Sequence, residues 1–393
     1  MGIIKIVTWL SIFLVFYSYF GYALLVWVII KARKKNQQID HSSGFEPPVS
    51  LIVAVYNEED VLKKKIENCL EIDYPKNKLK LIFVADGSTD NSAAIIKQYP
   101  QIELLHRPER QGKVAAINRT MSIVTTDYVV FCDANTFLNK DCIKEIIKHY
   151  RDEKIGAVAG EKKVVVPTTE GKPVKDGEGL YWKYESKLKQ IDSDFYSVVG
   201  AAGELFSIRT ELFEPVPAEV LLDDFIISMN ICKNGYRVIY EPKAYAMEAP
   251  SLTMKDEQKR KIRISAGGFQ SVVMLKELLN IYKYGKLAFL YISHRVSRWV
   301  VCPVLLPVIF ICNLIIVLFS GEGLYNIYTA LLIAQIAFYG MAFLGWLFSL
   351  RNIKNNLFYI PYYFVFINVA LYIGFSRFLK KKQTVLWEKA KRK

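Results

Sequence analysis

The chain has 393 residues, of which 52% are hydrophobic and 23% are charged, and its net charge is +14. This length and mixture indicate one ordinary domain joined to a membrane part, with the apolar residues gathered in separate segments. Part of the excess positive charge lies at 31–35 and 380–393, next to apolar segments, which is typical of contact with anionic membrane lipids; we therefore expect no nucleic-acid partner.

The first predicted element is a membrane helix within residues 1–31. Ile6–Ile30 carries no charge and is longer than the ~20 residues that cross a hydrocarbon core. No small-residue cleavage site follows it, so we expect it to stay in the mature protein. Lys31–Lys35 follow it and only Lys5 precedes it, which predicts a multi-pass protein of the cytoplasmic (inner) membrane whose next domain lies in the cytosol.

Residues 47–250 have the pattern of an α/β domain. Apolar runs that are typical of buried strands alternate with helix-like stretches, at Val49–Val55, Leu79–Ala85, Ile102–Leu105 and 127–132. This alternation predicts a mostly parallel sheet with helices on both faces. Such sheets bind ligands at the carboxyl ends of their strands.

Polar groups follow three of these strands, namely YNEE (Tyr56–Glu59), DGSTD (Asp86–Asp90) and DAN (Asp133–Asn135). Because strand ends meet at one edge of a parallel sheet, we expect these groups to lie together. Asp133 and Asn135, two residues apart, can direct oxygens at one Mg²⁺ or Mn²⁺ ion, and hard cations prefer such ligands. The structural alternatives are a turn with a helix N-cap for DGSTD and a loop cap for Asp133.

The same edge is expected to hold a nucleotide. Tyr56 can lie against a planar base, and Glu58 and Asp86 can accept hydrogen bonds from the base or ribose. No G-x-x-x-x-G-K-[ST] motif is present, and no G-x-G-x-x-G follows the first strand, so a glycine-rich phosphate loop is not expected. The six cysteines show no C-x-x-C spacing and are expected to be reduced, without a zinc site.

Two acids, Asp223 and Asp224, open a predicted helix that ends near Asn234–Gly235. Acids at a helix start are explained by the helix dipole alone. The functional alternative makes one of them a general base, which needs a carboxylate within hydrogen-bond reach of the attacking hydroxyl.

Residues 251–298 are expected to form an amphipathic segment at the membrane interface. Apolar residues at helical spacing alternate there with Lys and Arg, just before an apolar segment. Arg260, Lys261 and Arg263 either hold a diphosphate or form a solvated basic face.

Three uncharged segments follow within residues 299–378: Trp299–Phe319, Tyr328–Leu350 and Leu357–Ser376. They predict two to three C-terminal membrane helices. Three crossings would place the basic tail, 379–393, outside, against the positive-inside rule. Either the last segment, which contains Pro361, does not cross fully, or the tail is exported.

These motifs, in order with GKVAAIN at 112–118 and RKIRISAGG at 260–268, resemble the family 2 glycosyltransferases. The chain is most similar to membrane-embedded synthases of poly-N-acetylglucosamine, hyaluronan, chitin and cellulose, over roughly Pro47–Gly268. The resemblance implies a GT-A fold and inverting transfer of a hexosyl or N-acetylhexosaminyl group from a UDP-sugar to a saccharide or lipid-linked acceptor, with Mg²⁺ or Mn²⁺. It does not identify a partner subunit.

The resemblance also implies roles for particular residues. Those matched by position are the nucleoside contacts Tyr56, Glu58 and Asp86, the donor contact Lys113, the metal ligand Asp133, the base Asp224 and the diphosphate contact Arg263. Three departures stand out: the D-x-D motif reads D-A-N, Ala85 replaces the first acid of D-D-G, and Ile264 replaces the tryptophan of Q-x-x-R-W. In the family that tryptophan is a platform for the acceptor sugar, so its replacement argues against long processive synthesis more than against catalysis.

Three hypotheses remain open at this point. The first is a membrane enzyme that extends a surface or capsular polysaccharide. The second is a non-processive transferase that adds one sugar to a polyprenyl phosphate or a glycolipid. The third is a non-catalytic scaffold with a decayed transferase domain, against which the retained Asp133, Asp224 and Arg263 argue.

Overall fold

The structure is a computed structural model. It describes the chain except for residues 34–43, 165–176, 252, 322, 324, 352, 354, 383 and 385–393. Lys34, Lys35 and most of the basic tail 379–393 therefore lie outside the described residues.

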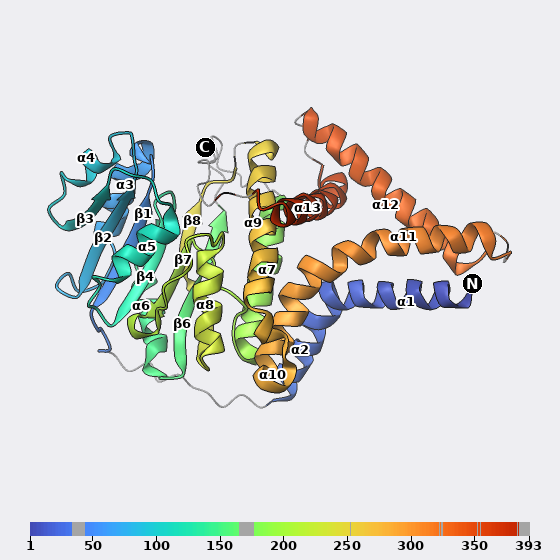
Figure 1. The fold of residues 1–393 in the computed structure, drawn as a ribbon, viewed down its shortest axis with the longest axis horizontal. Coiled ribbons are helices and arrows are strands. Elements are labelled where there is room, and N and C mark those ends of the chain that lie inside the picture. Colours follow the sequence, from blue (N-terminus) through green and yellow to red (C-terminus); the bar gives the residue numbers. More distant parts are fainter. Residues whose placement is uncertain are drawn as a thin grey trace.

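A mixed sheet forms the centre of the domain (Figure 1). Within the described residues its strand order is β3-β2-β1-β4-β7-β6-β8-β5. The strands are β1 Val49–Val55, β2 Leu79–Asp86, β3 Ile102–Arg107, β4 Tyr128–Asp133, β5 Phe137–Leu138, β6 Ile155–Val164, β7 Leu205–Arg209 and β8 Arg237–Glu248. The four strands predicted from the sequence are confirmed, and the third continues to Arg107.

The first four strands are parallel, as predicted. β1 pairs in parallel with β2 and β4, and β2 with β3. The register sets Val55 beside Ala85 and Ala54 beside Asp133, so the three polar loops begin at the same edge. β7 then pairs antiparallel with β4 and β6, which makes the sheet mixed.

Helices cover both faces of the sheet because successive strand residues point to opposite sides. Leu51 and Val53 pack with one group of helices, whereas Ile52 packs with the other. The first group is α3 Glu59–Leu70, α4 Ser92–Ile96 and α6 Cys142–Ile147, which continues as η2 Lys148–Arg151. The second is α5 Lys113–Met121, α7 Gly177–Phe195 and α8 Asp223–Lys233, with η3 Thr210–Leu212 at the end of β7.

Long apolar helices extend away from the sheet (Figure 1). Four helical stretches among the described residues are long and apolar enough to cross a membrane: Gly2–Ala32, Ile281–Phe319, Ile327–Leu350 and Asn356–Leu379. Their parts are α1 Gly2–Phe16, η1 Tyr17–Gly21, α2 Tyr22–Ala32, α10 Ile281–Leu290, η5 Tyr291–Val301, α11 Cys302–Phe319, α12 Ile327–Leu350 and α13 Asn356–Leu379. One such helix is N-terminal and three are C-terminal, as expected for a membrane protein.

Between the sheet and these helices lies α9, Met254–Met274, followed by η4, Lys276–Leu279. α9 falls within the predicted amphipathic segment and packs against α13 and η5. Most of the rest of that segment belongs to the helical stretch that begins at Ile281, is kinked at Gly285, where φ is +48°, and continues through Trp299.

Candidate active site

One cleft of about 620 Å³ brings together residues that the sequence places far apart. It lies between the carboxyl ends of β1, β2 and β4 and the helices α7, α8, α9 and η5. All ten residues predicted for the site line it: Tyr56, Glu58, Asp86, Lys113, Asp133, Asn135, Asp223, Asp224, Arg260 and Arg263. The predicted convergence at the sheet edge is thus present in the structure.

Hydrogen bonds fasten the loop after β1 to the loop after β2. The Thr89 backbone N–H donates to Asn57 Oδ1 at 2.8 Å, and the Glu59 N–H donates to Asp90 Oδ2 at 3.1 Å. Asp90 also accepts from the Ser92 N–H at 3.0 Å, at the start of α4. Most of DGSTD therefore joins the two loops, and Asp90 accepts the first backbone N–H of α4, whereas the N-cap position itself is Asn91.

Asp86 is the part of DGSTD that lines the cleft, and it is only 5% exposed. Its Oδ2 accepts the backbone N–H groups of Gln111 and Gly112 at 2.9 and 2.6 Å. Gly87, with φ +67°, leaves room for this loop, because a Cβ there would lie 2.4 Å from Arg110 Cβ. Asp86 thus holds the loop that precedes α5 against the end of β2.

The ring of Tyr56 has a cation on one face. The Arg110 guanidinium lies 3.6 Å from the ring centroid, a cation–π contact. A planar base would therefore have to use the other face or the ring edge. The sequence interpretation missed Arg110, which carries no motif signal of its own.

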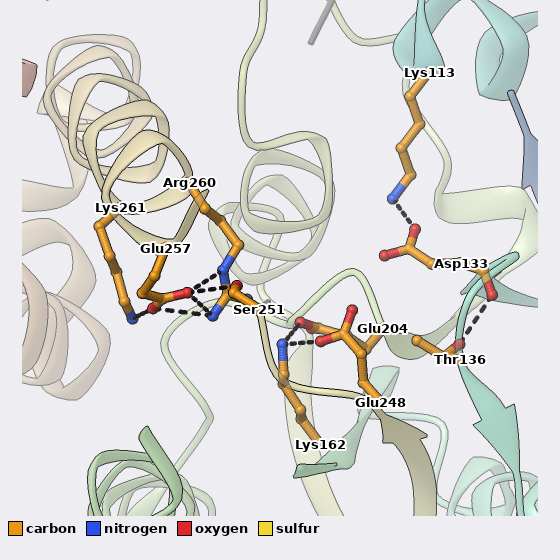
Figure 2. A network of polar contacts seen from close by, with 10 residues as sticks. All are labelled: Lys113, Asp133, Thr136, Lys162, Glu204, Glu248, Ser251, Glu257, Arg260 and Lys261. Atoms are coloured by element: carbon orange, nitrogen blue, oxygen red, sulfur yellow. Dashed lines mark hydrogen bonds and ion pairs between the residues drawn. The ribbon is translucent and has the colours of Figure 1, made fainter. Parts of the chain in front are cut away.

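Lys113 connects the two acidic groups of the cleft. Its Nζ lies 2.7 Å from Asp133 Oδ1 and 3.9 Å from Asp223 Oδ2, and Figure 2 shows the side chain pointing at Asp133. Burial lowers the pKa of Lys113, but the carboxylates of Asp133, Asp223 and Asp224 outweigh it and raise the pKa above its usual value. This lysine is therefore a fixed positive charge at the centre of the site.

Asp224 is in a position to accept a proton near neutral pH. Burial first, and then the neighbouring Asp223, raise the pKa of Asp224 to about 7, while Lys113 opposes them. Gly203 leaves open space in front of it, since a Cβ there would lie 3.3 Å from Asp224 Oδ2. A carboxylate with a pKa near the working pH is suited to general base catalysis.

Asp133 and Asn135 are the candidate metal ligands, one carboxylate and one amide, both on the cleft wall. In the part of the chain that the structure describes, no three His, Cys, Asp or Glu side chains form a group that could hold an ion. Protein ligands alone are thus too few for a closed site. The pair fits a hard cation that takes its remaining ligands from substrate phosphates and water, as Mg²⁺ commonly does.

Helix α9 supplies the cations of the opposite wall. The Arg260 Nε donates to Glu257 Oε2 at 3.0 Å, and Lys261 lies 3.6 Å from Glu257 Oε1 (Figure 2). Arg263 is also on the cleft wall, where burial lowers the pKa of its guanidinium and the carboxylates of Asp223, Asp133 and Asp224 oppose that shift. Arg263 thus faces the acidic centre, whereas Arg260 is held by its own helix.

An aromatic residue that the sequence interpretation missed, Trp299 of η5, also lines the cleft. Its ring lies 5.3 Å from that of Phe225, next to Asp224, and it packs on Gly268, where a Cβ would approach within 3.0 Å. Ile264, at the position of the family tryptophan, lines the cleft one helical turn from Gly268. Other missed lining residues are Tyr181, Trp182, Glu185, Lys189, Glu204, Arg295 and Arg377.

Comparison with known proteins agrees with this geometry. Residues 50–216 match the family profile described as Glycosyl transferase family 2. These residues form a family 2 glycosyltransferase domain. The match begins in β1 and includes Asp86, Lys113, Asp133 and Asn135.

Curated relatives extend the similarity beyond this glycosyltransferase domain. Poly-beta-1,6-N-acetyl-D-glucosamine synthase of Staphylococcus aureus (strain MSSA476) is 26% identical over 262 residues, which cover 64% of this chain and 60% of that protein. The synthase of the same name from Staphylococcus epidermidis is 24% identical over 276 residues, 67% of this chain and 62% of that protein. The chain therefore matches less than two thirds of the length of these relatives.

A solved structure shares the fold. It is that of the mannosyltransferase PcManGT from Pyrobaculum calidifontis in complex with GDP-Man and Mn²⁺, with a TM-score of 0.69 and 21% sequence identity. The alignment covers 96% of this chain and 100% of that one, so it includes the apolar helices as well as the glycosyltransferase domain. The predicted GT-A-like fold is thereby confirmed, with apolar helices that are long enough to cross a membrane.

Proposed function

We propose that this protein is a membrane glycosyltransferase that transfers a sugar from a UDP-sugar to a growing polysaccharide, with inversion at the anomeric carbon. The observation that carries the proposal is the cleft itself, where Asp133 from the end of β4 and Asp223 from the start of α8 meet at Lys113. The named synthase relatives support a polysaccharide product. The catalytic domain would face the cytosol.

Asp224 acts as the base in this proposal. It takes the proton of the acceptor hydroxyl, whose oxygen forms the new bond to the anomeric carbon. The bond from that carbon to the diphosphate breaks, and its electron pair leaves with the UDP. A single displacement of this kind inverts the configuration, and Asp223 assists by raising the pKa of Asp224.

The leaving diphosphate carries negative charge that the cleft must offset. Lys113 and Arg263 are cations on the walls beside it, and Arg can bind phosphate oxygens in pairs. Asp133 and Asn135 would hold Mg²⁺ or Mn²⁺, which when bound supplies charge neutralisation to the diphosphate. Tyr56, Glu58 and Asp86 would contact the nucleoside at the sheet edge.

A second candidate is a non-processive transferase with a polyprenyl phosphate or glycolipid acceptor. The observation that favours it is Ile264, which lies on the cleft wall where the family has its tryptophan platform. Trp299 offers an aromatic surface near Asp224 and so supports the polysaccharide acceptor. The size of the product separates the two candidates.

The proposal is tested with membranes that contain the full chain. A panel of UDP-sugars is supplied with Mg²⁺ or Mn²⁺, and both UDP release and product length are measured. We expect turnover of one UDP-sugar that is lost with a chelator and in Asp133→Ala, and a ladder of product lengths. Absence of turnover with every UDP-sugar would overturn the proposal, and a product of one added sugar would favour the second candidate.

A further inference from the structure

The last apolar helix, α13, does not extend away from the sheet as α1 and α11 do. Figure 1 shows α1 and α11 extending side by side away from the sheet, whereas α13 lies beside α9 near the base of these helices. By length and hydropathy α13 could cross a membrane as they could. Its contacts therefore have to decide where it lies.

α13 accompanies α9 along most of its length and in the same direction. Near the start of both helices, the Tyr359 hydroxyl lies 3.9 Å from Met254 Sδ. Near their ends, the rings of Phe375 and Phe269 are 4.9 Å apart. Between these points Gly374 allows close packing, since a Cβ there would lie 2.5 Å from Ser265 Cβ.

α9, against which α13 packs, cannot lie in the hydrocarbon of the bilayer. α9 carries seven charged side chains: Lys255, Asp256, Glu257, Lys259, Arg260, Lys261 and Arg263. A charged side chain is costly at the bilayer centre, and several of these line the cleft of the glycosyltransferase domain. α9 therefore lies at the membrane surface, and a helix that follows it stays at the same depth.

The two sides of α13 match such a position. One side packs on protein through residues that include Tyr363, Ala370 and Gly374, and the Tyr363 hydroxyl donates to Glu257 Oε1 at 3.3 Å. The other side exposes apolar groups, which include Leu357, Ile360, Val369 and Leu379. An exposed apolar face next to membrane helices is suited to the acyl chains just below the lipid headgroups.

The end of α13 returns to the active-site side. Arg377 in its last turn, and Thr384 beyond it, line the same cleft as Asp133. The Tyr372 hydroxyl donates to the carbonyl of Pro303, at the start of α11. The chain therefore leaves α13 on the side of the membrane from which α11 departs.

We infer that α13 does not cross the bilayer but lies in its surface layer, between α9 and the acyl chains, on the side of the catalytic cleft. Three helical stretches then cross: Gly2–Ala32, Ile281–Phe319 and Ile327–Leu350. Lys380, Lys381 and Lys382, which follow α13, then lie on the same side as Lys31 and Arg33, which satisfies the positive-inside rule. This inference does not depend on the proposed function.

Cysteine labelling with a membrane-impermeant maleimide tests the side. In sealed vesicles of one orientation, Lys382→Cys is compared with Gln98→Cys on the glycosyltransferase domain and Tyr325→Cys between α11 and α12, all exposed positions. The background chain carries Cys312→Ser, because the other native cysteines are buried. We expect Lys382→Cys to label with Gln98→Cys and not with Tyr325→Cys; labelling together with Tyr325→Cys would overturn the inference.

Nitroxide depth measurements test the position within the membrane. Spin labels are placed on exposed α13 positions 360, 369 and 379 and on exposed α12 positions 327, 336 and 350 as a crossing control. For α12 the depth should rise to a maximum in the middle and fall again. For α13 we expect one shallow depth at all three positions, and a maximum at 369 like that of α12 would contradict the inference.

Discussion

The two walls of the cleft differ in how they are built. The sheet wall, together with the start of α8, consists of residues that end or directly follow a strand, such as Asp86 and Asp133, or open a helix, such as Asp223. The helix wall draws on α7, α9 and η5, whose residues are separated by long stretches of chain and have no motif around most of them. The comparison shows that the sheet wall is encoded locally in the sequence, whereas the helix wall depends on how distant helices pack.

The largest effect is expected on the wall that carries the proposed base. Asp224→Asn removes the proton acceptor but keeps the shape, so transfer should fall by about 10²- to 10⁴-fold, the usual contribution of a general base. UDP-sugar binding, measured by titration calorimetry, should persist. Asp141→Asn, at the exposed start of α6, is the matched control and should keep full activity. Normal turnover by Asp224→Asn would rule out the assigned base.

Substitutions in the helix wall are expected to lower mainly the free energy of unfolding. The side chain of Glu185 of α7 is 3% exposed, and its carboxylate lies 2.6 Å from Arg298 Nη1 and 3.1 Å from Arg295 Nη1. Glu185→Gln would leave two buried guanidinium groups without their carboxylate, which costs about 3–5 kcal/mol. Thermal unfolding in detergent should show a clear drop, while Glu71→Gln, in an exposed pair with Lys140, should change little. Equal stability of both variants would contradict this account.

The pH dependence of the turnover number tests whether Asp224, at the start of α8, is the base. Because the pKa of Asp224 is raised to about 7, this base is protonated, and inactive, below that pH. The turnover number should therefore fall about tenfold for each unit below pH 7 and level off above it. A profile that is flat from pH 5 to 8 would show that another group accepts the proton.

The smallest expected effect concerns acceptor binding at Trp299. Trp299→Ala removes an aromatic surface, and aromatic contacts contribute about 0.5–1.5 kcal/mol, so the KM for the acceptor should rise about two- to tenfold. The KM for the UDP-sugar should not change, and Trp299→Phe should recover part of the loss. Trp346→Ala, on an exposed part of α12, serves as the control. Equal changes in both KM values would indicate a packing role only.

The sequence predicted the sheet wall well because parallel strands bring their carboxyl ends to one edge whatever lies between them. The register of β1 with β2 and β4 did place Asp86 and Asp133 together. The sequence could not predict that Asp86 would hold the loop before α5, or that Arg110 would cover Tyr56, since these contacts depend on backbone geometry. Trp299 and Arg377 were missed because an apolar segment does not reveal which of its faces meets a cleft.

The central claim is that Asp133 holds a cation against the diphosphate of the donor while Asp224 faces the acceptor side. The most direct test is a structure of the protein in membranes or detergent with UDP and Mn²⁺ bound. The account predicts density for Mn²⁺ in contact with the Asp133 carboxylate and a phosphate oxygen, and the nucleoside near Tyr56 and Glu58. Nucleotide bound outside this cleft, or Mn²⁺ held by other residues, would contradict it.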